Sequence, residues 1–180
     1  MYINQTHSKS IISYDLTTKF THKNSYLTPK LEKVVLNFGT KEVSLKLLAL
    51  TMAALEMVSA QTPKMTQSKK SNIFLKIRKG APVGCRVLLR NKFMSFFLFK
   101  TISNVLPNIK LFEGVTITKS LSTSKSFSFS LYDLLIFLEL ENQYTLFQKM
   151  PKMDISVVST VRNFQKSKVL LTGSRFLFKA

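Results

Sequence analysis

Cysteine, tryptophan and acidic residues are scarce or missing in this sequence of 180 residues. The single cysteine, Cys85, has no partner for a disulfide within the chain, and one thiol cannot build a cysteine-rich zinc site. Tryptophan is absent while phenylalanine occurs 15 times, so we expect a core of Phe, Leu, Ile and Val. No apolar run reaches the ~18 residues that a membrane-spanning helix needs. These features indicate one domain over residues 1–180 with a buried core.

The acidic residues are far outnumbered by the basic ones. Nine Asp and Glu stand against 27 Lys and Arg, which gives a net charge of +18. Such an excess of one sign repels itself unless a polyanion neutralises it. Nucleic acid is the commonest such partner, and an anionic membrane surface is the second. A basic protein that binds neither is the remaining alternative.

A long stretch without any acidic residue runs from Met57 to Phe112. A solvated surface normally mixes both signs of charge, because opposite charges relieve repulsion at short range. Each Lys or Arg that neutralises a phosphate releases a counterion, which favours binding to nucleic acid. We therefore interpret this stretch as an RNA-contacting surface. Its basic residues are Lys64, Lys69, Lys70, Lys76, Arg78, Lys79, Arg86, Arg90, Lys92, Lys100 and Lys110.

The first regular patterns are a strand and a helix. Residues 30–38 alternate between an apolar side and a polar side, which predicts a strand with one open face. Asn37 lies on the polar side, where its amide can read a base edge or sugar hydroxyl, or form a local bond near Gly39. Residues 41–60 have helical spacing. The apolar stripe expected to be buried is Leu45, Leu48, Met52 and Leu55.

A basic hairpin is predicted next. Residues 72–79 alternate, with Lys76 and Arg78 on one face, and residues 85–90 alternate Cys85, Val87 and Leu89 against Arg86, Leu88 and Arg90. Two glycines and a proline at 80–84 predict the turn between them. Phe74 is expected either to stack on a base or to pack in the core or loop.

The rest of the chain is less sharply patterned. Asn91 is expected to cap a helix from Lys92, which Pro107 ends or bends. The remaining expectations are a loop or ragged hairpin at 113–130, a strand or short helix at 131–140, a strand at 154–161 and a basic tail at 166–180. This order predicts an α+β fold, with a mainly antiparallel sheet, helices packed on one face and the other face open for RNA.

Signals for catalysis are few. His7 and His22 lie in the weakly patterned residues 1–28, and the sequence has no phosphate-binding loop, nucleophile elbow or paired metal ligands. Cys85 next to Arg86 is the one candidate nucleophile, but a strand cysteine on an apolar face is usually inert packing. We expect no enzyme, no cofactor and no metal site. The few lysines in the helix from Lys92 also argue against a membrane-surface protein.

Three ordered blocks resemble a known family. They are PKLEKVVLNFG (Pro29 to Gly39), QTPKMTQSKKS (Gln61 to Ser71) and KIRKGAPVGCRVLLR (Lys76 to Arg90), and the match continues to LPNIKLFEG (Leu106 to Gly114). These blocks are similar to the bacterial-type large-subunit ribosomal protein five family. The resemblance is good over about Tyr26 to Gly114. It therefore marks an RNA-binding core at 29–114 and a divergent part at 115–180.

The resemblance implies a structural constituent of the large subunit that binds 5S rRNA in the central protuberance. The family holds a loop of that RNA on the open sheet face, and Asn37 and Gln61 match its polar positions. The rRNA-binding residues expected here are Lys33, Asn37, Gln61, Lys64, Lys69, Lys70, Arg86 and Arg90. A hairpin loop is implied to contact peptidyl-site tRNA through Lys76, Arg78, Lys79, Gly80, Pro82 and Gly84.

The resemblance also implies further partners and marks departures. Large-subunit rRNA, neighbouring central-protuberance proteins and a small-subunit head protein are expected partners, and a membrane is not. Leu88 stands where the family usually has Thr, Leu138 replaces a Pro, and the usual glycines are missing between Val115 and Ser130. This drift, the Phe- and Lys-rich composition and the absence of a transit pattern favour a mitochondrial ribosome. A plastid or a bacterial cytoplasm is the alternative.

Overall fold

The computed structural model describes residues 10–20, 24, 28–40, 44–110, 112, 114, 125–161, 163–176 and 178. The chain divides into two compact units. The first unit comprises Met1–Val34, Arg90–Ser128 and Ser156–Ala180, and the second comprises Val35–Leu89 and Phe129–Ile155. The expectation of a single domain over residues 1–180 stays a prediction.

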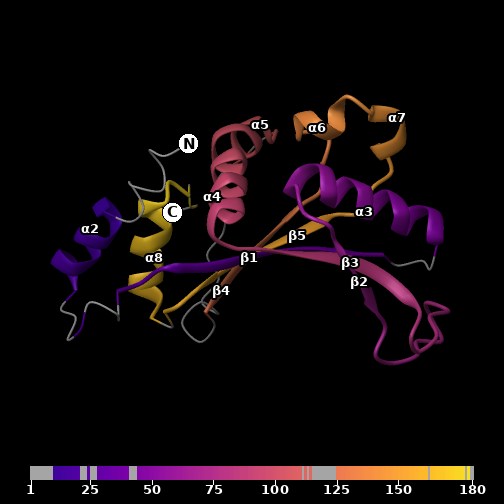
Figure 1. The fold of residues 1–180 in the computed structure, drawn as a ribbon, viewed down its shortest axis with the longest axis horizontal. Coiled ribbons are helices and arrows are strands. Elements are labelled where there is room, and N and C mark those ends of the chain that lie inside the picture. The colour runs from indigo at the N-terminus through magenta and orange to yellow at the C-terminus, as the bar shows by residue number, and fades with distance from the viewer. Residues whose placement is uncertain are drawn as a thin grey trace. The chain divides into compact units, whose positions relative to one another are not determined.

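Five strands form one antiparallel sheet in the order β2-β3-β1-β5-β4 (Figure 1). The strands are β1 (Leu31–Gly39), β2 (Lys64–Gln67), β3 (Pro82–Leu89), β4 (Ser126–Leu131) and β5 (Met153–Ser159). Eight helical segments accompany them in the described part of the chain. They are α2 (Ile12–Lys19), α3 (Leu45–Ser59), α4 (Asn91–Lys100), η3 (Thr101–Val105), α5 (Leu106–Asn108), α6 (Leu138–Glu141), α7 (Tyr144–Phe147) and α8 (Phe164–Gly173). The α+β prediction is confirmed.

Alternating side chains give each strand one buried face, because successive residues of a strand point to opposite sides. In β1 the buried residues are Val34, Leu36 and Phe38, and in β5 they are Met153, Ile155 and Val157. The residues between them are half-buried and lie on the opposite, open face, as expected for β1. The strand expected at 154–161 is confirmed as β5.

The helix α3 covers the buried face of β3 within the second unit. Ser44 caps it by accepting a hydrogen bond from the Leu47 amide at 3.5 Å. Leu48 and Leu55 are buried as expected, whereas Leu45 is 74% exposed, so its place in the apolar stripe was wrong. Leu45 is the first residue of the helix, where the chain enters it from the N-cap at Ser44.

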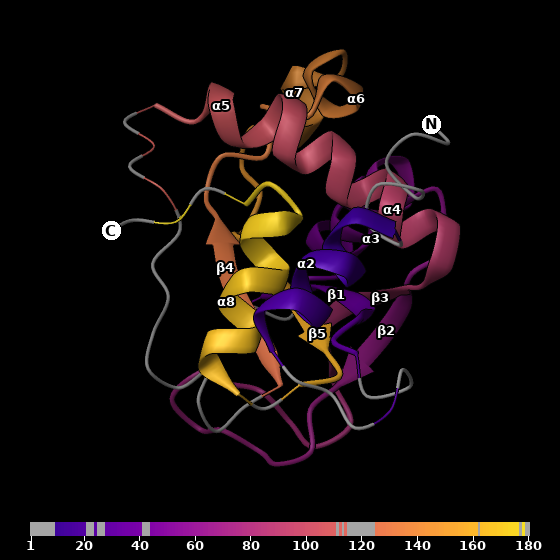
Figure 2. The same ribbon diagram turned by 90° about the vertical axis from the view of Figure 1, so that its left-hand side faces the viewer.

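The helices α2 and α8 pack together within the first unit (Figure 2). Ile12 and Leu16 of α2 meet Leu170 of α8 in a buried cluster. A Cβ on Gly173 would lie 3.2 Å from the Ile12 Cγ1, so a side chain there would have to displace the Ile12 side chain slightly. The basic tail expected from 166 therefore contains a helix that its pattern did not predict.

The helix that follows β3 begins differently from the sequence prediction. It starts at Asn91 itself, with Arg90 at the N-cap position and no side-chain capping bond, so the expected Asn91 cap is wrong. Asn91 has a φ of 49°, a left-handed conformation that asparagine tolerates better than most residues. The helix continues through η3 into α5 and ends at Asn108, one residue after Pro107, as expected.

Candidate nucleic-acid interface

The open face of the second unit carries the predicted RNA-binding side chains of three adjacent strands. Asn37 of β1 is half-buried, while Arg86 of β3 and Lys64 of β2 are exposed. The residues on either side of Arg86 in β3, Cys85 and Val87, are buried. The strand therefore points its basic residue to solvent and its apolar residues to the core, as the alternation predicted.

Lys64 and Arg86 lie directly opposite each other in the antiparallel pairing of β2 and β3. Like charges in this position destabilise a sheet, because their side chains stand only a few ångströms apart. Neither side chain forms an ion pair within the described part of the chain. A phosphate between them would relieve the repulsion, so this pair is a candidate anion-binding feature of the face.

The loop that joins β2 to β3 differs from the predicted hairpin. Residues 72–79 form no strand, because β3 pairs with Lys64–Gln67 instead. A single isolated bridge joins Asn72 to Ile77, and the residues between them form a turn. The Asn72 Oδ1 accepts hydrogen bonds from the amides of Phe74 and Leu75, at 3.0 and 3.4 Å, and Lys76 has a φ of 52°. The asparagine thus turns the chain where alternation predicted an extended run.

The base of this loop is closed by Ser68. Its hydroxyl donates a hydrogen bond to the Arg78 carbonyl at 2.6 Å, and its amide donates one to the Ala81 carbonyl at 2.9 Å. The Gly80 amide donates to the Ser68 carbonyl at 3.0 Å. Hydrogen bonds thus cross the loop of fourteen residues (68–81) at two places, at Ser68 and at the Asn72–Ile77 bridge.

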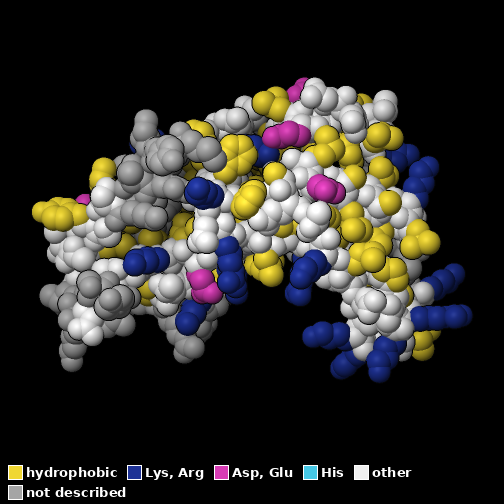
Figure 3. Space-filling view, in the orientation of Figure 1, with side chains coloured by type: hydrophobic (Ala, Val, Ile, Leu, Met, Phe, Trp, Pro, Cys, Tyr) yellow, Lys and Arg dark blue, Asp and Glu magenta, His cyan; other side chains and the backbone are white. Residues whose placement is uncertain are grey.

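This loop gathers exposed cations around an apolar tip. Figure 3 shows Lys and Arg side chains clustered around the segment between β2 and β3. They are Lys69, Lys70, Lys76, Arg78 and Lys79, all exposed. Ile73 and Phe74 at the tip are 91% and 98% exposed. Core or loop packing, one of the two expectations for Phe74, is therefore wrong.

Three residues predicted at the hairpin turn have different places. Gly80 lies in the loop with a φ of 84°, a conformation that favours glycine. Pro82 and Gly84 belong to β3, so the expected turn at 80–84 is wrong for both of them. A Cβ on Gly84 would overlap the Phe38 carbonyl oxygen. Gly84 is therefore required for the close approach of β1 and β3.

The other residues predicted to bind rRNA lie outside the strands β2 and β3 and the loop between them. Lys33 and Arg90 belong to the first unit, where Lys33 lies 3.9 Å from Glu32 and Arg90 is exposed. Gln61 is half-buried just after α3, and its backbone amide donates a hydrogen bond to the Ser59 hydroxyl at 3.3 Å. Leu88 is 44% exposed on the open face of β3, where the resembled family usually carries a hydroxyl.

Cys85 is a packing residue. It is buried beneath α3, where burial raises the pKa of the thiol and a hydrogen bond with Thr51 lowers it to a smaller extent. A protonated, inaccessible thiol is a poor nucleophile. Among the described residues no group of His, Cys, Asp or Glu is arranged to hold a metal ion. In the same part of the chain no helix is long and apolar enough to cross a membrane.

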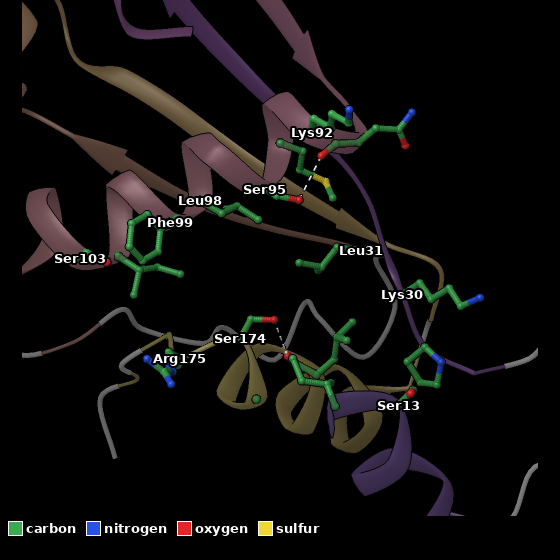
Figure 4. A pocket seen from close by; sticks show the side chains of 17 residues that line it. Ser13, Lys30, Leu31, Lys92, Ser95, Leu98, Phe99, Ser103, Ser174 and Arg175 are labelled. Atoms are coloured by element: carbon green, nitrogen blue, oxygen red, sulfur yellow. Dashed lines mark hydrogen bonds between the residues drawn. The ribbon is translucent and has the colours of Figure 1, made fainter. Parts of the chain in front are cut away.

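A cavity of about 630 Å³ lies in the first unit, between α2, α4 and α8 (Figure 4). Its wall is largely apolar, with Leu31, Leu98 and Phe99 among its residues. Two of its hydroxyls are already used, because Ser95 donates to the Asn91 carbonyl at 3.1 Å and Ser174 donates to the Leu170 carbonyl at 2.9 Å. Those hydroxyls are therefore committed to their own helices.

Sequence reasoning missed the polar residues that β4 and β5 present on the open face. Ser130 and Asp154 are joined by a hydrogen bond of 2.6 Å in the second unit, and Ser128 and Ser156 by one of 2.8 Å in the first. The alternating serines of SFSFSL were a signal for an open strand face, but they had been assigned to a loop or ragged hairpin.

Comparisons with known proteins identify the family of the chain. The model of the C-terminus of the ribosomal L5 family matches residues 82–178. The large ribosomal subunit protein uL5m of Reclinomonas americana is 36% identical over 169 residues, which cover 93% of this chain and 92% of that protein. The uL5 protein of Nitrosomonas europaea is 32% identical over 173 residues, covering 95% of each chain. That of Caldanaerobacter subterraneus is 38% identical over 158 residues, covering 87% of each. The chain belongs to the L5 family of large ribosomal subunit proteins.

Proposed function

We propose that this chain, a structural protein of the large ribosomal subunit, binds 5S rRNA on its open sheet face and contacts peptidyl-site tRNA with the loop 68–81. The observation that carries the proposal is the unneutralised pair of Lys64 and Arg86 on that face. The family supports the ribosomal assignment and is not a class of enzymes, so the role is binding rather than catalysis.

The 5S rRNA contact combines charge with one amide. Lys64 and Arg86 bind phosphates, and the neighbouring Asn37 offers both a donor and an acceptor to a base edge or a sugar hydroxyl. Arg86 can engage a phosphate through two parallel N–H groups, which fixes the register of the backbone as well as adding affinity. Additional rRNA contacts are proposed for Lys33, Gln61, Lys69, Lys70 and Arg90.

The tRNA contact uses the shape of the loop. Lys76, Arg78 and Lys79 share the loop with Phe74 and all four are exposed, so cations for a phosphate backbone and an aromatic stacking surface lie on one segment. The hydrogen bonds that cross this loop at Ser68 and Asn72 restrict it before binding, which reduces the ordering entropy lost on contact. Gly80 contributes a turn without a side chain, allowing the RNA backbone to approach closely.

The wider assembly follows from the same proposal. Large-subunit rRNA and neighbouring central-protuberance proteins contact the chain in the ribosome. A small-subunit head protein contacts the segment after Gly114, of which residues 115–124 lie outside the described part of the chain. A mitochondrial ribosome is the proposed location, with a bacterial one as the alternative that the relatives also support.

Co-sedimentation with ultraviolet crosslinking tests this function. The tagged chain is expected to sediment with the large subunit and to crosslink to 5S rRNA through peptides that contain Asn37 or Arg86. A variant carrying both Lys64→Glu and Arg86→Glu should lose the crosslink, whereas Lys46→Glu, an exposed change on α3, should keep it. Sedimentation without any crosslink to 5S rRNA would contradict the proposed contact.

A further inference from the structure

A connected polar cluster lies where β4 ends and β5 begins, entirely within the second unit. The Ser130 hydroxyl donates to the Asp154 Oδ1 at 2.6 Å. The Lys152 Nζ lies 3.6 Å from the same oxygen and 6.0 Å from the centroid of the Tyr132 ring. Ser130 and Asp154 lie on the strand face opposite buried Leu131 and Met153, and Tyr132 and Lys152 are the residues just beyond the ends of the two adjacent strands.

This cluster leaves binding groups available. The Tyr132 side chain is 78% exposed, so much of its ring is open to a ligand. Asp154 is partly exposed, and its Oδ2 has no hydrogen-bond partner among the described residues. The Oδ1 atom has a serine donor that fixes the direction of the carboxylate. Because each carboxylate oxygen has two lone pairs, the cluster holds one oriented carboxylate that can still accept at both oxygens, beside one accessible aromatic ring.

A carboxylate on this face is unexpected for a surface that binds only phosphates. The chain has nine acidic residues against 27 basic ones, and a negative charge near an RNA backbone is repelled by it. The same carboxylate is favourable if it meets hydrogen-bond donors of a base. Guanine presents N1–H and N2–H side by side on its Watson–Crick edge, which matches the two oxygens of one carboxylate.

We propose that Tyr132, Lys152 and Asp154 form a site for one unpaired guanine of the bound RNA, with the base stacked on Tyr132 and its Watson–Crick edge on Asp154. Lys152 lies beside both groups and neutralises the phosphate of that nucleotide. Diagonal neighbours on adjacent strands are about 7–8 Å apart, within the span of a stacked purine. This site deepens the proposed function and rests on it, because RNA must already lie along the open face.

Short RNAs with one variable base test the site directly. The probes are uridine oligonucleotides with a central guanosine, inosine or adenosine, and the readout is the dissociation constant for the full chain. We expect guanosine to bind about tenfold more tightly than adenosine, with inosine between them because it lacks the N2 amine. Asp154→Asn should abolish this preference, because an amide cannot accept both donors.

The matched control is Asp133→Asn, which removes the same charge from an exposed carboxylate that accepts a hydrogen bond from the nearby Leu135 amide at 3.1 Å. It should keep the guanosine preference. Tyr132→Ala should weaken all three probes alike, since stacking is tolerant of base identity. Equal loss of preference in both aspartate variants, or a wild-type chain without a preference, overturns the site.

A parallel titration with 5S rRNA separates this inference from the proposed function. Wild-type chain that binds 5S rRNA but shows no guanosine preference overturns the guanine site alone. Wild-type chain that does not bind 5S rRNA overturns the proposed function, whatever the short probes show.

Discussion

Lys64 and Arg86 face each other across the β2–β3 ladder, so two positive charges are held together on the open side of the sheet. Directly opposed like charges reduce the stability of a sheet by up to ~1 kcal/mol. The fold therefore retains an electrostatic repulsion that a bound anion would reduce.

Replacement of either residue of this pair should weaken RNA binding without lowering the stability of the folded chain. We expect Lys64→Ala or Arg86→Ala to leave the free energy of unfolding unchanged or raise it by about 0.5 kcal/mol, because repulsion is relieved. Either change should weaken 5S rRNA binding several-fold through a lost phosphate contact. Denaturant unfolding and filter binding measure the two effects. Lys46→Ala on α3 should alter neither, and a stabilised variant with unchanged affinity would mean that the pair binds no RNA.

Asn37 is expected to contribute a polar contact rather than charge. Asn37→Ala should weaken binding to a 5S rRNA loop fragment by ~1–3 kcal/mol, if its removal leaves a buried polar partner unpaired. The salt dependence of binding should not change, since no phosphate contact is lost. Unchanged affinity would indicate that the Asn37 amide serves only a local bond near Gly39.

Substitution of Phe74 should test tRNA binding without changing the stability of the fold. Because its side chain is 98% exposed, Phe74→Ala should leave the melting temperature unchanged. Loss of one stacked base should weaken tRNA binding by ~1–3 kcal/mol. Ribosomes carrying the variant can be compared in peptidyl-site tRNA binding, with Tyr14→Ala, a change of an exposed side chain of α2, as the control. Equal tRNA affinity would remove Phe74 from the contact.

Gly84 and Gly39 form a matched pair for a stability test. Gly84→Ala places a Cβ against the Phe38 carbonyl oxygen, whereas a Cβ at Gly39 meets nothing within 4 Å. We expect Gly84→Ala to lower the free energy of unfolding by about 3 kcal/mol or more, since backbone must shift. Gly39→Ala should cost about 1 kcal/mol or less. Thermal unfolding of both variants checks the difference, and equal stabilities would contradict the close approach of β1 and β3.

Cys85 should make stability depend on alkaline pH. Burial raises the pKa of its thiol above the ordinary value of 9.0, so the folded chain retains a proton that the unfolded chain releases. The stability that this provides is complete below the unfolded pKa and is lost as pH rises through the folded pKa. The difference in unfolding free energy between wild type and Cys85→Ala should therefore shrink as the pH rises above 9.0, the ordinary pKa of the thiol. A constant difference would contradict a raised pKa.

The periodic parts of the fold were predictable, and the irregular ones were not. The alternation in residues 30–38 identified β1 because one face is buried and the other open. The same logic failed at 72–79, where the Asn72 side chain and the left-handed Lys76 turn the chain before a strand can form. Helix α8 escaped prediction because the α2 residues that bury its apolar side lie far away in sequence.

The candidate site was predictable in composition rather than in geometry. The acid-free tract identified the basic residues, but only the strand pairing shows that Lys64 opposes Arg86. The alternation assigned Lys76 and Arg78 to a strand face, whereas they lie in a loop closed by Ser68. Cross-strand contacts such as Ser130 with Asp154 join residues 24 positions apart, which local pattern cannot reveal.

The salt dependence of 5S rRNA binding tests the central claim most directly. Affinities of the wild-type chain and of the Lys64→Ala/Arg86→Ala variant should be measured from about 50 to about 200 mM potassium salt. We expect a steep loss of affinity for the wild type, and a slope of log affinity against log salt that is smaller by about two in the variant. A flat response of the wild type, or equal slopes for both chains, would contradict an RNA-binding face built around this pair.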